Sequence, residues 1–401
     1  MLSLRIVSLT LSVAAATAAQ PGGELLWKAK CGTVTDEQSA VSGAIVWSSP
    51  LVIGDSVFIG SRDQFLYAIS RATGEILWAK NTSGYIDSSP TANDDGTVIF
   101  VGSGSDSILA VDPVTGNTIW DYRTNVSHFL FPKTQLILVM LLVQGFIDST
   151  PVLSGKEVFC GSDDSNIYAL DADTGSWKWN TSTGGTVYSS PTIDTERGSL
   201  YIGSNSNSLY SISLTTGEIK WAFATDDNVQ SKPALGQRAQ LVFTGSWDGF
   251  MYAIQADSGI LGWRTKLSPG DPDTGTGIDS SPALTPDGNL VFIGSYDQYL
   301  YALDALTGII VWKAHCGDGP EGVRSSARVS DDGTLVYVGS SDGYLYSFFV
   351  ADGSLHWRAN CTSTPFDTPY GVRSTPAISP DGNEVYVGSD DGFLYAFTSG
   401  L

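Results

Sequence analysis

The sequence predicts an all-β fold, an eight-bladed β-propeller built of four-stranded blades. A phrase recurs along the chain: Ser-Ser-Pro, an apolar run ending in Gly-Ser, a turn with Asp, Leu-Tyr-Ala, Thr-Gly and Trp, shown in full by residues 278–312. Repeats of about 42 to 50 residues, with four short strand-like runs separated by Gly, Asp and Pro, are typical of propeller blades. The glycine of Gly-Ser marks eight repeats, at Gly60, Gly102, Gly161, Gly203, Gly245, Gly294, Gly339 and Gly388.

The Trp positions predict how the ring closes. Gly23 stands four residues before Trp27, the same step that separates Gly74 from Trp78. We therefore expect a strand near the N-terminus to pair with the C-terminal blade, so that residues 20–401 form one domain without open sheet edges. Trp27 precedes all eight glycines of Gly-Ser. The other seven Trp of the repeat each follow one of these glycines, at Trp78, Trp120, Trp179, Trp221, Trp263, Trp312 and Trp357.

Residues 1–19 have the pattern of a secretory signal peptide. Arg5 precedes an apolar run over residues 6–16, and the small residues Ala16 and Ala18 fit a cleavage site. The alternative, an uncleaved membrane anchor, needs about 20 apolar residues. A cleaved signal implies a secreted protein, extracellular or lumenal, without a membrane span. Sequons then mark candidate glycosylation sites at Asn81, Asn180 and Asn360.

The composition is strongly acidic. The chain has 42 Asp and Glu against 21 Lys and Arg, for a formal net charge of −21. This charge argues against nucleic acids and anionic membrane surfaces as partners. Much of the acid lies in turns such as Asp287-Gly288 and Asp381-Gly382, where Asp and Gly tolerate the backbone angles of a hairpin. We favour this turn role over calcium ligation.

One segment interrupts the repeat. Twelve residues separate Trp78 and Trp179 from the next Ser-x-Pro proline, whereas 31 separate Trp120 from Pro151. The surplus of 19 residues matches the atypical apolar segment 126–144, whose Val-Ser start and Gln end can be encoded by a splice donor and acceptor. The segment is therefore either a translated intron or a genuine apolar loop, and its apolar run is too short to span a membrane. The transcript sequence decides between the two.

Residues 294–297 (Gly-Ser-Tyr-Asp), 300–304 (Leu-Tyr-Ala-Leu-Asp) and 307–312 (Thr-Gly to Trp) carry a resemblance to a known repeat. The chain from Gly23 onward resembles the pyrroloquinoline-quinone-like repeat of quinoprotein alcohol dehydrogenases and of the lipoprotein subunit of the bacterial outer-membrane barrel-assembly machine. The resemblance implies a propeller in which each Trp packs against the neighbouring blade. It leaves function open, because this scaffold carries enzymes, chaperone-like binders and adaptor domains.

The resemblance to the dehydrogenases implies a quinone beside a vicinal Cys-Cys disulfide, a calcium ion and a catalytic Asp. This chain has no adjacent cysteines and no Cys-x-x-Cys-His segment. Its three histidines leave little material for His-based catalysis or a metal site. We therefore expect no catalytic residue, no metal and no cofactor, and we keep quinone with calcium as the less favoured alternative.

Three of the four cysteines share one position in the repeat. Cys31, Cys316 and Cys361 each follow a blade Trp by four residues, in blades that are neighbours around the ring. They are disulfide candidates, Cys361 with Cys31 or with Cys316, and the alternative is three separate thiols. Cys160 replaces an apolar residue before Gly161 and is expected to be a buried thiol.

The candidate binding site is the position directly before Ser-x-Pro, which varies while the repeat around it stays constant. This residue opens the innermost strand of each blade, so all eight are expected to ring one mouth of the central channel. Arg324 and Arg373 would either clamp a carboxylate, sulfate or phosphate there, or be neutralised by Asp across the blades. The ring has the composition of a polar recognition site: Trp47, Asp87, Asp148, Tyr188, Gln230, Asp279, Arg324 and Arg373.

The longer connections after Trp27, Trp263, Trp312 and Trp357 lie on the same face, and elaborated loops on a rigid scaffold often carry binding residues. The sequence thus predicts a secreted, monomeric, non-catalytic propeller that binds a protein partner or a small polar or anionic ligand at this mouth. The alternatives are a quinoprotein-like oxidoreductase and an extracellular carbohydrate-binding protein. These loops and the adjoining turns contain further candidate binding residues, namely Asp271, Asp273, Glu321, Phe366, Tyr370, Arg62, Trp247 and Tyr296.

Overall fold

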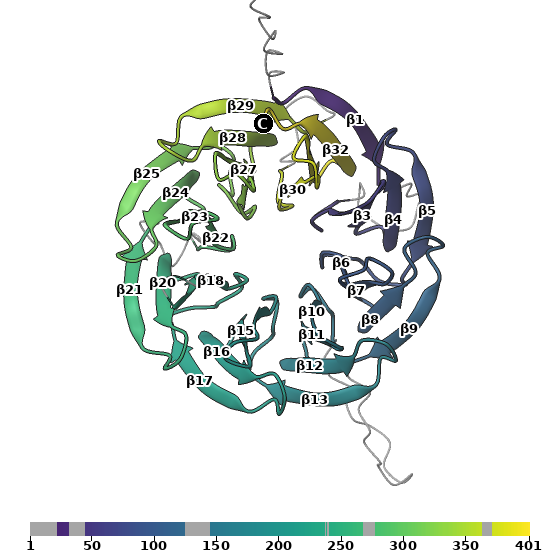
Figure 1. The fold of residues 1–401 in the computed structure, drawn as a ribbon, viewed down its shortest axis with the longest axis vertical. Helices are drawn as coiled ribbons and strands as arrows, with labels where there is room; N and C mark the ends of the chain where they lie inside the picture. The colour runs from purple at the N-terminus through teal and green to yellow at the C-terminus, as the bar shows by residue number, and fades with distance from the viewer. Residues whose placement is uncertain are drawn as a thin grey trace, which may run out of the picture.

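Eight four-stranded sheets stand as blades around a central axis in the computed structural model (Figure 1). The structure describes residues 22–31, 45–124, 145–236, 238, 240–267, 277–362 and 371–401. In seven of these blades the strands pair antiparallel with their neighbours in sequence, as β2, β3, β4 and β5 do. The predicted all-β, eight-bladed propeller is confirmed.

The two inner positions of each blade are filled by short strands. The innermost strands are β2 (Leu51–Ile53), β6 (Thr91–Ala92), β10 (Val152–Ser154), β14 (Thr192–Asp194), β18 (Ala234–Gly236), β22 (Ala283–Leu284), β26 (Arg328–Val329) and β30 (Ala377–Ile378). The second strands are β3 (Ser56–Gly60), β7 (Ile99–Ser103), β11 (Glu157–Gly161), β15 (Ser199–Ser204), β19 (Leu241–Gly245), β23 (Leu290–Gly294), β27 (Leu335–Gly339) and β31 (Glu384–Gly388).

The two outer positions carry the Leu-Tyr-Ala and Trp segments. The third strands are β4 (Phe65–Ser70), β8 (Ser107–Val111), β12 (Asn166–Asp171), β16 (Ser208–Ser213), β20 (Phe250–Gln255), β24 (Tyr299–Asp304), β28 (Tyr344–Phe349) and β32 (Phe393–Thr398). The outermost strands are β5 (Ile76–Asn81), β9 (Thr118–Arg123), β13 (Trp177–Ser182), β17 (Ile219–Ala224), β21 (Leu261–Lys266), β25 (Ile310–His315), β29 (Leu355–Asn360) and β1 (Leu25–Lys30).

The N-terminal strand β1 completes the last blade, whose order is β1-β32-β31-β30. Trp27 lies opposite Ala396 and Lys28 opposite Tyr395 in this antiparallel pair. Figure 1 shows β1 outside β32, beside the C-terminus. The two ends of the chain therefore meet in one sheet, as the position of Trp27 predicts, and the closure protects both sheet edges.

Each blade Trp joins its blade to the next one. The Trp78 indole Nε1 donates to Pro113 O at 3.0 Å, and a Cβ on Gly116 would lie 2.9 Å from the ring of Trp78. The glycine of Thr-Gly is thus required for the ring to pack this closely. The same pair of contacts recurs at every junction, for example between Trp27 and Arg71 O with Gly74. In the other six junctions, the Trp Nε1 donates to the backbone oxygen of Ala172, Leu214, Ala256, Ala305, Val350 or Ser399.

The first Ser of Ser-x-Pro ties the channel wall to the second strand. Ser48 Oγ accepts from the amide of Gly60 at 3.1 Å, and the matching bond is present in all eight blades. The second residue links neighbouring blades, since Ser49 N donates to Ser89 Oγ and Thr375 N donates to Ser49 Oγ. These bonds satisfy backbone groups that the short innermost strands leave unpaired.

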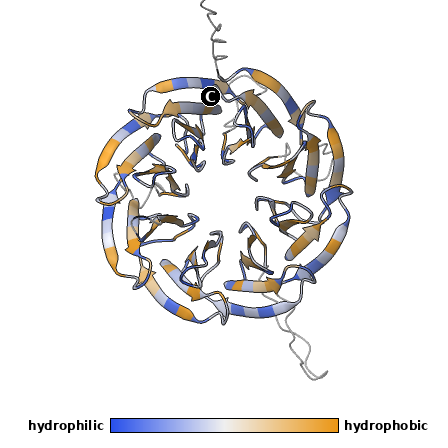
Figure 2. Ribbon diagram, viewed as in Figure 1, coloured by the Kyte–Doolittle hydropathy of each residue, from blue (hydrophilic) through white to orange (hydrophobic). Residues whose placement is uncertain are grey.

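The hydrophobic core lies between the blades, in clusters that take residues from two neighbours. One cluster packs Phe159 and Ile167 against Leu200 and Ile212. The outermost strands also present apolar side chains to solvent, such as Leu77 and Leu355. Figure 2 shows orange segments along the outer ring of strands.

Four expectations fall outside the described residues. They concern the signal peptide 1–19, the insertion 126–144, and the loop residues Asp271 with Asp273 and Phe366 with Tyr370. In the ranges that are described, no helix has the length and hydropathy to cross a membrane.

Candidate functional site

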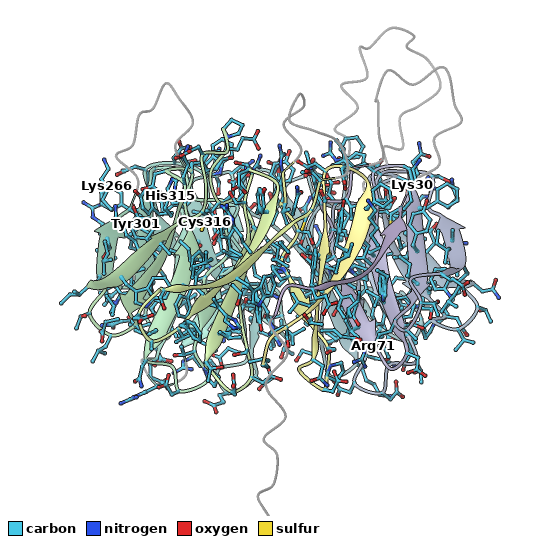
Figure 3. All side chains as sticks on the ribbon, turned by 90° about the horizontal axis from the view of Figure 1, so that it is seen from above. Lys30, Arg71, Lys266, Tyr301, His315 and Cys316 are labelled. Carbon is cyan, nitrogen blue, oxygen red and sulfur yellow. The ribbon has the colours of Figure 1, made fainter. Side chains whose placement is uncertain are left out.

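A pocket of about 560 Å³ opens at the channel mouth on one face of the ring. It lies where the outermost strands end and the innermost strands begin. Figure 3 shows this face on the side of Lys30, Lys266 and His315, the last residues of β1, β21 and β25, with Arg71 nearer the opposite face. The lining comes from all eight blades: Trp47, Arg62, Tyr85, Asp87, Phe146, Asp148, Asp163, Tyr188, Gln230, Asp279, Arg324 and Arg373.

All eight residues that directly precede Ser-x-Pro line this one pocket. The repeat holds each of them between two buried neighbours. Before Asp87, for example, the side chain of Ile86 is fully buried against Gly60 of the adjacent blade, and after it Ser88 Oγ accepts from Gly102 N. The sequence therefore places these side chains, whereas their role in binding stays a prediction.

A second set of side chains comes from the residues that follow Gly-Ser, in every blade except the one where this residue is Gly104. Gln230 donates across a blade boundary to Asn205 Oδ1 at 3.1 Å. Within one blade, the Tyr296 hydroxyl donates to Asp279 at 2.8 Å. Trp247 Nε1 also donates to Asp279. The first ring and this second set thus fix one another by hydrogen bonds.

The arginines at the mouth are already paired with carboxylates. Arg324 Nη2 lies 2.7 Å from Asp279 Oδ2, and Arg373 Nη2 lies 2.6 Å from Glu321 Oε2. Glu321 also contacts Arg324 Nη1 at 3.3 Å, so this carboxylate occupies the space between the two guanidiniums. Arg373 Nε lies a further 3.3 Å from the buried Asp390. Of the two interpretations of these arginines, the geometry matches neutralisation across the blades and not an open anion clamp.

Arg62 is held in a comparable way by its neighbours. It donates to Asp87 through Nε at 2.9 Å and through Nη2, and its Cζ lies 3.4 Å from the centre of the Trp47 ring. Trp47 Nε1 in turn donates to Asp390 at 2.8 Å. Burial raises the pKa of Asp87, and the Arg62 guanidinium opposes that shift.

The opposite side of the pocket has acids without basic partners. We call Tyr85, Phe146, Asp148, Asp163 and Tyr188 the acid–aromatic half. No Lys or Arg in the described part of the chain forms an ion pair with either Asp of this half. The Oδ1 atoms of Asp148 and Asp163 are both buried and accept no hydrogen bond. The Tyr85 and Phe146 rings meet edge to face at 5.4 Å.

Burial is the main reason that both acids titrate high. It raises the pKa of Asp148 to about 8, and the charges of Asp87 and Asp163 add to the shift. Burial likewise raises the pKa of Asp163 to about 7, although a hydrogen bond from Tyr188 opposes the shift. Tyr85 gives Asp148 a similar hydrogen bond. In both residues, Oδ1 is a buried oxygen without a hydrogen-bond partner.

Sequence reasoning missed three pocket residues, Tyr85, Phe146 and Asp163. Tyr85 and Phe146 stand two positions before Asp87 and Asp148, and Asp163 directly follows Gly-Ser. Their positions within the repeat could therefore have identified them. Among the loop and turn candidates, Arg62 lines the pocket, while Trp247 and Tyr296 support Asp279.

Of the two interpretations of Cys31, Cys316 and Cys361, the structure matches three separate thiols, because all three are free and buried. Each occupies a different inter-blade cluster, because the shared repeat position separates the thiols by the width of a blade. Their carbonyls accept from the Gly-Ser serines, as Ser340 Oγ donates to Cys316 O at 2.6 Å. Cys160 is also free and buried.

The candidate glycosylation residues Asn81, Asn180 and Asn360 are exposed on the outermost strands. Asn81 Oδ1 accepts from Ser83 N, and Asn360 Oδ1 accepts from Thr362 N. Their modification stays a prediction.

Solved structures show the same fold at low identity. BamB from Moraxella catarrhalis is 18% identical with a TM-score of 0.65, over 93% of this chain and 98% of that one. Quinohemoprotein alcohol dehydrogenase ADHIIG from Pseudomonas putida HK5 is 16% identical with a TM-score of 0.70, over 94% and 76%. The computationally designed Ika8 protein is 14% identical with a TM-score of 0.72, over 94% and 100%.

A search of curated proteins finds no match. The family described as outer membrane protein assembly factor BamB matches residues 12–142, 142–244 and 228–400, which is nearly the whole chain. This chain therefore belongs to the family of the outer membrane protein assembly factor BamB.

Proposed function

We propose that this chain is a secreted, monomeric, non-catalytic propeller that binds a protein partner over the pocket face. The observation that carries the proposal is the pocket itself, to which all eight blades contribute polar or aromatic side chains. Such a lining supplies charge, hydrogen bonds and ring surface, which are the means of recognition. The family description, an assembly factor, supports a role in binding proteins.

Capture with a blocked pocket tests this proposal. The bait is the folded chain, immobilised and exposed to the medium or lumenal extract of its source cells. A Gln230→Trp variant places a large ring at the mouth, and Val114→Trp, on an 82% exposed side chain in a turn of the opposite face, is the matched control. Wild type and Val114→Trp should retain the same proteins, and Gln230→Trp should lose them. Equal retention by all three baits contradicts the proposal.

A quinone-dependent oxidoreductase is the second candidate, favoured by the fold likeness to quinohemoprotein alcohol dehydrogenases. The residues present do not fit the cofactor well. Pyrroloquinoline quinone carries three carboxylates, whereas the pocket arginines are already paired and its unpaired groups, Asp148 and Asp163, are acids. The four cysteines lie in inter-blade packing and not in the pocket lining. Absorbance titration with quinone and calcium tests this candidate, and saturable binding would support it.

A carbohydrate-binding protein is the third candidate. Rings beside carboxylates, as in Tyr188 with Asp163, are groups that stack on and hydrogen-bond to sugars. A glycan array distinguishes it, because selective glycan binding that Gln230→Trp abolishes would favour this candidate over a protein partner.

A further inference from the structure

Resting on the proposed partner binding, we propose that the acid–aromatic half of the pocket receives a basic side chain, arginine or lysine, of the partner. The site consists of Asp148 and Asp163 with the rings of Tyr85, Phe146 and Tyr188. It differs from the anion clamp that the sequence suggested, because the preferred ligand has the opposite charge.

Two oxygen atoms lack the partner that a cation would supply. Asp148 Oδ1 and Asp163 Oδ1 are buried and accept no hydrogen bond, although both residues line an open pocket. A buried polar atom without a partner is costly, and an ionised one more so. A guanidinium or ammonium group bound in this half of the pocket would offer hydrogen-bond donors to these carboxylates and offset their charge.

The basic side chains of the pocket lining are already paired with other carboxylates. The basic side chains of the lining are Arg62, Arg324 and Arg373, and each already pairs with Asp87, Asp279, Glu321 or Asp390. Moving any of them would leave another carboxylate unpaired. Among the described residues, the lining therefore holds no unpaired basic side chain, and the proposed partner would supply the positive charge.

The pocket itself contains an example of the expected interaction. Arg62 donates to Asp87 while its guanidinium lies 3.4 Å from the centre of the Trp47 ring and 5.3 Å from that of Tyr85. A cation that meets carboxylates and ring faces together gains both ion pairing and cation–π attraction. The acid–aromatic half offers the same two kinds of group without the arginine.

An organic cation fits this site better than a metal ion. In the ranges that the structure describes, no group of three or more His, Cys, Asp and Glu is arranged to hold a metal. The aromatic ring faces of this half favour guanidinium and ammonium groups.

Binding should depend on pH, because both acids must ionise to attract a cation. The groups that face Asp148 are Asp87, Asp163, Arg62 and Tyr85, and those that face Asp163 are Tyr188, Asp164 and Asp106. The negative charges of the neighbouring acids oppose the ionisation of Asp148 and Asp163. A bound cation offsets these charges and therefore favours ionisation. We expect the affinity to rise from pH 6 to pH 8.5, with protons released on binding.

Calorimetric titration with small probes tests the inference. The probes are N-acetyl-arginine amide, N-acetyl-lysine amide and, as the neutral isostere, N-acetyl-citrulline amide. At least one cationic probe should bind at pH 8.5, and citrulline should bind at least about tenfold more weakly. Equal binding of citrulline, or no binding of either cation, overturns the proposal.

A pair of double variants locates the binding. Asp148→Asn with Asp163→Asn should weaken the cationic probe about tenfold or more, since it removes both charges. Asp226→Asn with Asp318→Asn, two exposed acids outside the lining, changes the net charge equally and should leave binding unchanged. Equal affinity in the two double variants overturns the proposal. Its failure is separable from that of the proposed function, which depends on whether Gln230→Trp loses the partner.

Discussion

The guanidinium of Arg62 lies over the ring of Trp47, with its Cζ 3.4 Å from the centre of the ring. Arg62 also pairs with Asp87 of the next blade, so this contact joins two blades at the rim of the pocket. The other two pocket arginines are tied to carboxylates in the same manner. The basic residues of the mouth therefore join neighbouring blades, whereas Asp148 and Asp163 beside them form no ion pair with a described residue.

Removing Arg373 should destabilise the protein. Its partner Asp390 has a side chain only 6% exposed, so Arg373→Ala leaves a buried carboxylate without its cation. We expect the free energy of unfolding to fall by about 1–3 kcal/mol. Arg328→Ala is the control, because Arg328 pairs on the surface with an Asp331 that is 84% exposed, and its loss should cost under about 0.5 kcal/mol. Chemical denaturation measures both, and equal losses would contradict the assignment.

Gly308 should not tolerate a side chain. It adopts a φ of +72°, and a Cβ there would lie 2.5 Å from the ring of Trp263. Gly308→Ala should therefore lose about 2–4 kcal/mol, from backbone strain and from the displaced indole together. Gly155 has a φ of +60° with open space around it, so Gly155→Ala isolates the backbone term at about 1–2 kcal/mol. Denaturation of both variants checks that Gly308→Ala costs more.

The four thiols should be unreactive until the protein unfolds. Burial raises the pKa of Cys31 and of Cys160 to about 12, and it also raises the pKa of Cys316 and Cys361. A thiol reagent at pH 8 should modify none of them in the native protein and all four in denaturant. Reducing agent should leave the melting temperature unchanged. A lower melting temperature under reducing conditions would indicate a disulfide.

Asp148→Asn should stabilise the protein at alkaline pH. Because the folded-state pKa of Asp148 is about 8, the folded protein holds a proton that the unfolded chain releases near pH 4. Stability therefore falls as the pH rises from about 4 to 8, and Asn removes that loss. We expect the variant to gain at least about 1 kcal/mol above pH 8 and nothing near pH 4. A melting temperature gain independent of pH would contradict this account.

The repeat phase was sufficient to predict the architecture and the first ring of the pocket. Trp27 and the residues before Ser-x-Pro occupy constant positions, and the backbone repeats with them. Side-chain contacts between blades were harder to predict from the sequence, because they depend on how far each side chain extends. Glu321 between two arginines, and Arg62 on Trp47, involve residues whose blade positions differ. The thiols show the same limit, since equal positions in neighbouring blades do not bring side chains together.

Hydrogen–deuterium exchange with a captured partner tests the central claim most directly, namely that the pocket face receives it. Partner binding should slow exchange in peptides that contain residues 84–88, 145–149 and 186–190, which carry five of the lining side chains. The outermost strands β5 and β17 should exchange as in the free protein. Slowed exchange confined to those outer strands or to the turns of the opposite face, with the three pocket segments unchanged, would contradict the claim.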